Sequence, residues 1–298
     1  MVNISIATAT FFNVSFKETL KLIKKAGFQY IELDIYWQGG DNWEAAQHLK
    51  GIKPKEVLKM VEDSGLKINS LHDIGGVIYK DSDSLIAPDT YEYLEFGGER
   101  IPAIIFHTPH KRTEDIHWWS RYQSKAQKDL TQLKNKYIVC VENLQHFEGY
   151  QVPLLDPEEL LDFAKETGIF INIDTTHFAH TGTDIVNAAG VLKDRVKGIH
   201  FSDFKDGRTH LFPGEGVLDF KEFFNNLNIG QIAAMTLECN IPYRQGEPEI
   251  AIGAMVKARG YLLNTLEQGP LKYKETYIQK NFKFRGEQIH DFIGKRNT

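Results

Sequence analysis

The chain has little cysteine: Cys140 and Cys239 are the two among 298 residues. Both lie in apolar runs, which is typical of small buried side chains in a reducing compartment and not of a disulfide framework. No stretch approaches the ~20 apolar residues that a membrane-spanning helix needs. The first segment, MVNISIATAT, lacks the basic region and long apolar stretch of a signal peptide. We therefore expect a cytoplasmic protein with no membrane partner.

The chain also has no excess of positively charged residues. The chain has 35 Lys and Arg against 40 Asp and Glu, which gives a formal net charge of −5. Proteins built mainly to hold nucleic acid tend to be basic, so we do not expect nucleic acid as the partner. No Gly-rich dinucleotide fingerprint follows the first apolar run, and no phosphate-binding P-loop is present. The lack of a dedicated phosphate site favours an unphosphorylated substrate.

Short apolar runs rich in β-branched and aromatic residues are present instead, and they predict buried strands. There are eight, at residues 4–10, 30–36, 68–73, 103–109, 137–144, 170–176, 198–204 and 233–239. Helix signals lie between them: a capping box at Ser15 and Glu18, and a start at Asp156 and Pro157 that stops at Gly168. A further helix is predicted over 219–230.

Strand and helix alternate eight times, which indicates parallel βα units in an α/β fold. In a chain of this length they predict a single-domain (β/α)8 TIM barrel over residues 1–265. A doubly wound open sheet is the alternative. Residues 266–298 are partly aromatic and basic, and we interpret them as a short C-terminal extension. This extension would pack on the barrel or on a neighbouring subunit of a homo-oligomer; a solvated tail is the other interpretation.

Titratable side chains stand at the ends of seven of these eight runs: Glu32 with Asp34, His72, His107, Glu142, Asp174 with His177, His200 with Asp203, and Glu238. The carboxyl ends of barrel strands face one mouth, so we expect these side chains to converge. Clustered carboxylates repel one another unless a cation lies between them. Three carboxylates and one imidazole suit Mn²⁺, Mg²⁺, Co²⁺ or Zn²⁺, and the predicted ligands are Glu142, Asp174, His200 and Glu238.

The ordered strand-end segments VEN, IDTTH, IHFSD and LEC, with PGEGVLDF after the seventh run, resemble the xylose isomerase-like barrel superfamily over about residues 1–265. That superfamily includes sugar isomerases and epimerases, some dehydratases and the endonuclease IV repair enzymes. The resemblance implies the same four metal ligands. It also implies that His177 and Arg208 contact the substrate. We predict His72 and His107 as further substrate-binding residues.

The resemblance implies a metal-dependent isomerase or epimerase acting on a sugar, polyol or keto acid. Glu142 and Glu238 would act as an acid–base pair that moves a proton beside a metal-bound carbonyl, through an enediolate. A dehydratase acting on a keto-polyol is one alternative, because elimination begins with the same proton abstraction. A barrel that only binds a ligand is another.

An endonuclease IV-like zinc phosphodiesterase is the remaining alternative. Those enzymes use three zinc ions, and His72, His107 and His210 would supply additional ligands. Arg208 stands where the nuclease pattern has an acid, and a cation there would repel a third ion. We therefore place this alternative below isomerase chemistry, with His210 as a possible additional ligand.

Overall fold

The computed structural model describes residues 2–11, 14–35, 48–74 and 86–268. Eight parallel strands close into a barrel in the order β1-β10-β7-β6-β5-β4-β3-β2. Each predicted run forms one of them, which confirms the TIM barrel over the open sheet. The strands are β1 (Ile4–Ala7), β2 (Tyr30–Ile35), β3 (Lys67–Asp73), β4 (Ala103–His107), β5 (Ile138–Glu142), β6 (Phe170–Asp174), β7 (Val196–Phe201) and β10 (Ala234–Leu237).

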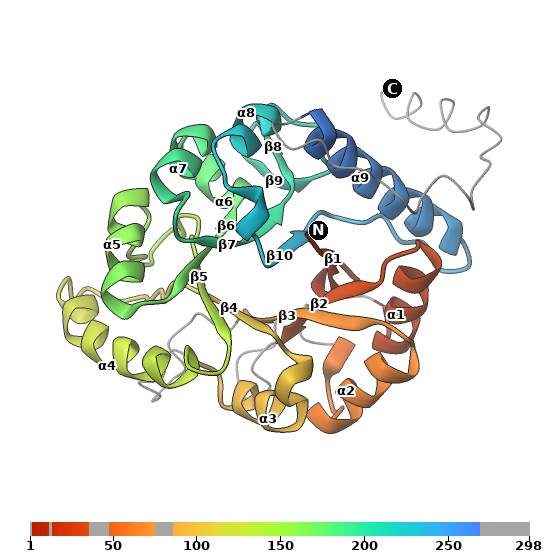
Figure 1. Cartoon of the computed structure of the whole chain (residues 1–298), viewed down its shortest axis with the longest axis horizontal. Coiled ribbons are helices and arrows are strands. Elements are labelled where there is room, and N and C mark those ends of the chain that lie inside the picture. The colour runs from red at the N-terminus through yellow and green to blue at the C-terminus, as the bar shows by residue number, and fades with distance from the viewer. Residues whose placement is uncertain (1, 12–13, 36–47, 75–85, 269–298) are drawn as a thin grey trace.

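The helices lie outside the strands and surround the barrel (Figure 1). They bury an apolar face against the strands, which is the layer arrangement expected of parallel βα units. Their bounds are α1 (Phe16–Lys25), α2 (Pro54–Asp63), α3 (Pro88–Gly97), α4 (Trp118–Leu133), α5 (Pro157–Thr167), α6 (Thr175–His180), α7 (Ile185–Leu192), α8 (Phe220–Asn225) and α9 (Pro248–Gln268). Short 3-10 turns cover η1 (Thr8–Phe11), η3 (Gly98–Arg100) and η4 (Ile229–Gln231).

The predicted helix signals act as capping groups. The Ser15 side chain accepts from the backbone N–H of Glu18 at the start of α1. Asp156 accepts from the first turn of α5 (2.9 Å to Glu158 N), and Gly168 ends that helix at φ 70°. A residue with a Cβ pays a steric cost at such a φ, so the local sequence sets where the chain turns back to β6.

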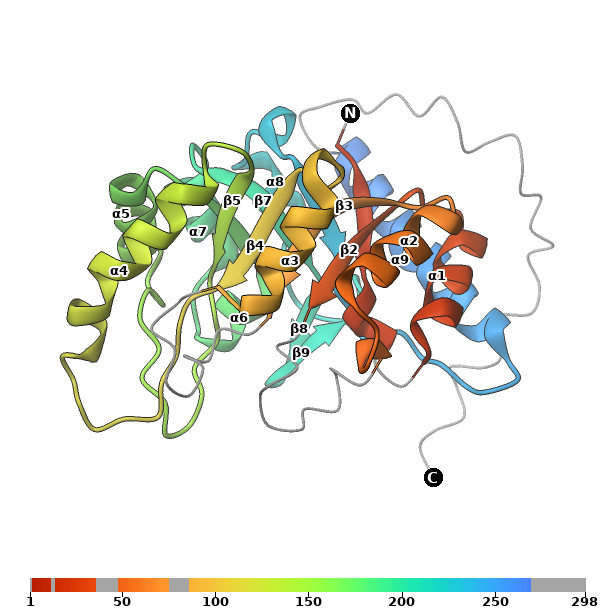
Figure 2. The ribbon, with the colours of Figure 1, turned by 90° about the horizontal axis from the view of Figure 1, so that it is seen from below.

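Three segments differ from the expected pattern. β7 ends at Phe201, and a short antiparallel hairpin of β8 (Asp203–Lys205) and β9 (Arg208–Leu211) follows it. Figure 2 shows this hairpin beyond the arrowhead ends of the barrel strands. The helix expected over 219–230 stops at Asn225 and is followed by η4. α9 continues to Gln268, and residues 269–298 lie outside the described residues.

The two cysteines are buried and unpaired with each other. In the described ranges, no helix combines the length and the apolar character needed to cross a membrane.

Candidate functional site

Strand register brings the titratable residues to one level of the barrel. Asp34 pairs with His72, His107 pairs with Glu142, and Asp174 pairs with His200. Glu238 directly follows β10. All of these residues lie at the carboxyl ends of the strands, where barrel enzymes place their active sites.

The four predicted metal ligands lie together. One ligand atom from each of Glu142, Asp174, His200 and Glu238 lies within 4.8 Å of the other three. His200 Nδ1 is 3.0 Å from Glu142 Oε2 and 2.8 Å from Glu238 Oε2. Three of these residues are fully buried, and the Glu238 side chain is 16% exposed.

Each of these four residues also has a buried atom that forms no hydrogen bond among the described residues: Glu142 Oε1, Asp174 Oδ2, His200 Nδ1 and Glu238 Oε2. Two of these atoms, His200 Nδ1 and Glu238 Oε2, contact each other only as an ion pair. A buried polar atom left unpaired costs about 1–3 kcal/mol. Because these four residues also bring ligand atoms within 4.8 Å of one another, they could satisfy such atoms by holding a shared cation. Three carboxylates and one imidazole form a donor set for Mn²⁺, Mg²⁺, Co²⁺ or Zn²⁺, so the residues fit a divalent ion.

The segment IDTTH explains how Asp174 is aimed. Its Oδ1 accepts from the N–H groups of Thr176 (2.8 Å) and His177 (2.7 Å) and so caps helix α6. The side chain of Asn143 accepts from Asp174 N (2.8 Å) and donates to Asp174 O (3.0 Å). These bonds occupy Oδ1 and leave Oδ2 without a hydrogen bond among the described residues.

The carboxylate of Glu142 is held by a residue that sequence reasoning missed. Asn172, on β6, donates to Glu142 Oε2 at 3.1 Å. A Cβ on Gly198 of the neighbouring strand would lie 2.2 Å from Asn172 Oδ1, so glycine there makes room for the amide. The signal was available: an amide inside the apolar run FINID is unusual for a buried strand.

Two further groups share these carboxylates. His72 and His107 lie with Glu142, and their Nε2 atoms are 3.2 Å and 3.5 Å from its oxygens. His177 and His210 lie with Asp174. The second group contains backbone strain: His210 has φ 53°, a left-handed conformation that costs a non-glycine residue about 1–2 kcal/mol. Strain of this kind concentrates at functional sites.

The predicted substrate contacts lie in different environments. His177 is buried at 6% exposed, and the His107 side chain is 12% exposed; the substrate contact of both stays a prediction. His72 is fully buried with Nδ1 toward Asp34 and Nε2 toward Glu142, which fits a partner of carboxylates better than a substrate contact. Arg208 lies in β9, two residues before His210, with an exposed side chain. Its substrate contact stays a prediction.

The cluster is held by opposite charges. Burial lowers the pKa of His200, but Glu142, Glu32 and Glu238 raise it to well above its usual value. Burial likewise raises the pKa of Glu142, yet His200, His72 and His107 together hold it well below its usual value. His107 differs, because burial outweighs the attraction of Glu142 and keeps its pKa well below the usual range. Because metal ligands must be deprotonated, a divalent ion bound to this cluster would release protons.

The loop after the hairpin is organised by Asp203. Its carboxylate accepts from the backbone N–H groups of Gly214 (2.9 Å), Gly216 (2.9 Å) and Leu218 (3.2 Å). A Cβ on Gly216 would lie 2.2 Å from Asp203 Oδ1, so the PGEG sequence is needed for this close approach. The loop belongs to the segment that carries His210 into the site.

Known proteins support this reading of the fold. The family model described as xylose isomerase-like TIM barrel matches residues 20–258. Similar solved structures include an L-ribulose 3-epimerase (18% identity, TM-score 0.66, covering 90% of this chain and 95% of that one). Others are the IOLI protein with a bound zinc atom (16%, 0.65, 90% and 99%) and D-psicose 3-epimerase from Clostridium cellulolyticum H10 (14%, 0.64, 89% and 99%). No curated protein matches the sequence.

Proposed function

The chain belongs to the xylose isomerase-like TIM barrel family, and from this membership we propose that it is a divalent-metal-dependent isomerase or epimerase of a sugar or polyol. The observation that carries the proposal is the convergence of Glu142, Asp174, His200 and Glu238, which bring ligand atoms within 4.8 Å of one another and each keep a buried atom without a hydrogen bond among the described residues. The similarity in fold to sugar 3-epimerases supports it. A keto acid is the other substrate class that this chemistry would suit.

When bound, a divalent ion would supply Lewis-acid polarisation of a substrate carbonyl. Glu142, Asp174, His200 and Glu238 would hold it. Glu238 is the most exposed of the four, so its carboxylate is best placed to take a proton from a substrate carbon or to return one. Glu142 is the second member of the proposed pair. It comes from β5 and Glu238 follows β10, and these two strands lie on opposite sides of β7.

His107 lies with Glu142 and His177 lies with Asp174, and both rings would orient substrate hydroxyl groups. Arg208, which lies on the exposed hairpin of β8 and β9, would bind an oxygen of the substrate. A carboxylate of suitable pKa that moves a proton in this way contributes about 10²–10⁴-fold to the rate.

Solvent-deuterium exchange tests the proton-transfer role. The Mn²⁺-loaded protein is incubated in D₂O with a panel of ketoses and aldoses, and label at the carbon next to the carbonyl is measured. Glu238→Gln and Glu142→Gln should each lose about 10²–10⁴-fold of the exchange. The matched control is Glu215→Gln, an exposed carboxylate on the neighbouring loop. Normal exchange in either active-site variant would remove that residue from the acid–base pair, and loss of water from the substrate would indicate a dehydratase.

A zinc phosphodiesterase is the second candidate, because two further groups of possible metal ligands share residues with the central four. His72 and His107 share Glu142 with the central four, and His177 and His210 share Asp174, so the described residues could hold more than one ion. Native mass spectrometry with elemental analysis, after loading with Mn²⁺ or Zn²⁺ and removal of excess, gives the stoichiometry. About one ion per chain supports the isomerase proposal. Two or three tightly held zinc ions would direct assays to abasic-site DNA and phosphodiesters.

A further inference from the structure

Glu32 is a buried carboxylate whose role the proposed reaction does not explain. It lies on β2 between Ile31 and Leu33, which both pack in the apolar core. Because side chains alternate along a strand, Glu32 and Asp34 face the barrel interior. The pairing of β2 with β3 shifts by one residue here: Ile31 pairs with Ile68, but Glu32 pairs with Ser70. This irregularity places a hydroxyl beside the carboxylate.

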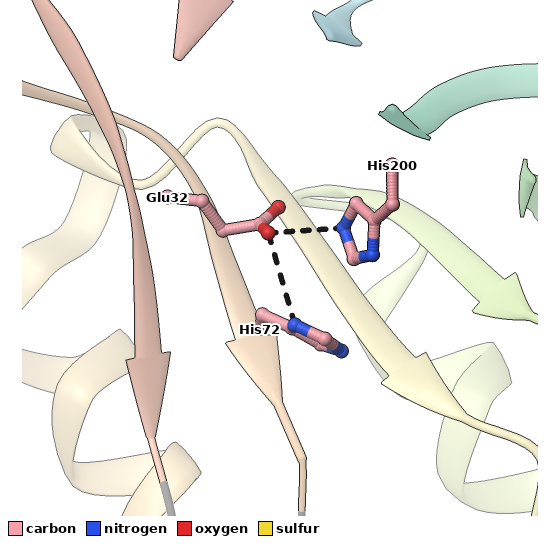
Figure 3. Close-up of side chains that lie close together, drawn as sticks. All are labelled: Glu32, His72 and His200. Atoms are coloured by element: carbon pink, nitrogen blue, oxygen red, sulfur yellow. Dashed lines mark ion pairs between the residues drawn. The ribbon is translucent and has the colours of Figure 1, made fainter. Parts of the chain in front are cut away.

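Two hydroxyl groups hold one oxygen of Glu32. Ser70 Oγ donates to Oε2 at 2.6 Å and Thr236 Oγ1 donates to it at 3.2 Å. The other oxygen, Oε1, is 2.9 Å from His200 Nε2 and 3.7 Å from His72 Nδ1 (Figure 3). Neither Oε1 nor His200 Nε2 forms a hydrogen bond in the described ranges, so the contact between them is an ion pair. The carboxylate is thus fixed at one end and aimed at the imidazole at the other.

The contact between Glu32 and His200 bears on which ring nitrogen of His200 binds a metal ion. A fully buried carboxylate without a positive or N–H partner is strongly destabilising, so the ring should keep its proton on Nε2, toward Glu32. The lone pair then lies on Nδ1, the atom that faces Glu142 and Glu238. Outer-sphere carboxylates fix the tautomer and ring orientation of metal-binding histidines in this way.

We propose that Glu32 is a positioning residue that selects the Nδ1-binding tautomer of His200 and thereby sets the affinity of the central metal site. The inference rests on the metal site of the proposed function. It does not depend on which reaction that site catalyses, because its readout is metal binding and not turnover.

The test compares zinc affinity, by competition with a chromophoric chelator, in Glu32→Gln and in a matched control. The control is Asp73→Asn on the neighbouring strand, also a buried carboxylate, whose Oδ2 accepts from Ala87 N and Thr90 Oγ1 (both 2.7 Å). We expect Glu32→Gln to weaken zinc affinity by about 10- to 100-fold with unchanged stoichiometry. The control should stay within about twofold, since Asp73 belongs to none of the possible metal-ligand groups of the described residues.

A ring-proton signal distinguishes positioning from general structural support. In the zinc-loaded wild type, the long-range ¹⁵N–¹H spectrum should show His200 protonated at Nε2, with slow solvent exchange of that proton. Exchange should accelerate in Glu32→Gln. If that variant does not fold, Ser70→Ala keeps the carboxylate but removes its shortest anchor, and it should weaken zinc binding in the same direction by a smaller factor.

Three results would overturn the proposal. Equal zinc affinity in Glu32→Gln and the wild type would remove the positioning role while leaving the metal site intact. Loss of one ion per chain in Glu32→Gln would make Glu32 a ligand, in the group that it forms with His72 and His200. A wild type that binds no divalent ion would reject the proposed function together with this inference.

Discussion

The histidines at the mouth of the barrel are fixed in two different ways. His200 Nε2 lies 2.9 Å from Glu32, and His72 Nδ1 lies 3.1 Å from Asp34; we call these two rings the carboxylate-backed pair. His177 Nδ1 and His210 Nδ1 each lie 3.0 Å from a backbone carbonyl oxygen, of Asn143 and Glu238 respectively; we call them the carbonyl-backed pair. In the carboxylate-backed pair the other nitrogen faces Glu142: His72 Nε2 lies 3.2 Å and His200 Nδ1 lies 3.0 Å from its Oε2. In the carbonyl-backed pair, His177 Nδ1 also lies 3.3 Å from Glu142 Oε1.

The two kinds of partner have different consequences for metal binding. A carboxylate increases the basicity of the ring that it orients, whereas a neutral carbonyl orients the ring without adding charge. The carboxylate-backed pair also lies on β3 and β7, within the barrel wall, while the carbonyl-backed pair lies on α6 and β9, beyond it. We therefore expect tight binding at the central group of Glu142, Asp174, His200 and Glu238. Binding should be weaker at the outer group of Asp174, His177 and His210.

Removing one ring from each pair tests the comparison most strongly. His200→Ala should lower the affinity for the first ion by more than about 100-fold, because even an outer-sphere partner contributes about 10- to 100-fold. His210→Ala should leave the first ion in place and affect later zinc equivalents. Isothermal titration with zinc measures both. A larger loss in His210→Ala than in His200→Ala would reverse the proposed order of the sites.

The second largest expected change in zinc affinity comes from removing the charge of Asp34, the carboxylate beside His72 Nδ1. Asp34→Asn keeps an acceptor for Ala9 N and Thr8 Oγ1, which bind Oδ2 at 2.7 Å and 3.0 Å, but removes the charge beside the ring. We expect about a tenfold loss of zinc affinity at the group formed by His72, His107 and Glu142. The zinc affinity of the outer group should be unaffected. Titration of the double variant Asp34→Asn/His210→Ala would measure zinc binding at the inner groups without the contribution of the outer one. Wild-type affinity in Asp34→Asn would show that charge behind His72 is unimportant.

The pH dependence of binding examines the carbonyl-backed pair. Burial alone would lower the pKa of His177. The nearby carboxylates of Asp174 and Glu142 together outweigh burial and raise this pKa to about 9. The metal-free ring therefore carries a proton at neutral pH, and an ion that binds there must displace it. Affinity for the outer ion should rise with pH between 6.5 and 8.5, by up to about tenfold per pH unit for each proton displaced. Calorimetry in buffers of different ionisation enthalpy counts the protons, and His177→Ala should reduce that count.

Much of this arrangement could be predicted from sequence because strand ends share one mouth. The apolar runs that contain Glu142, Asp174 and His200 predicted without any contact information that these three side chains lie together, as they do. The hairpin that carries His210 was not predicted, because the polar segment RTHL lacks the apolar alternation of a strand. The backing role of Glu32 was also missed. That role depends on a one-residue shift in pairing, which sequence periodicity does not reveal.

The smallest expected effect comes from a matched pair of serines, one behind each pair of histidines. Ser202 Oγ lies 3.4 Å from His210 Nδ1, which already has the Glu238 carbonyl at 3.0 Å. Ser202→Ala should therefore change the affinity for the outer ion by less than about twofold, since a long hydrogen bond beside a good one contributes little. Ser70→Ala removes a 2.6 Å bond to Glu32 and should have the larger effect, on the central ion. Both variants delete one buried hydroxyl. Zinc affinities measured by chelator competition can therefore be compared directly between Ser70→Ala and Ser202→Ala. Equal losses would mean that hydroxyl burial, and not the kind of partner behind the ring, controls metal affinity.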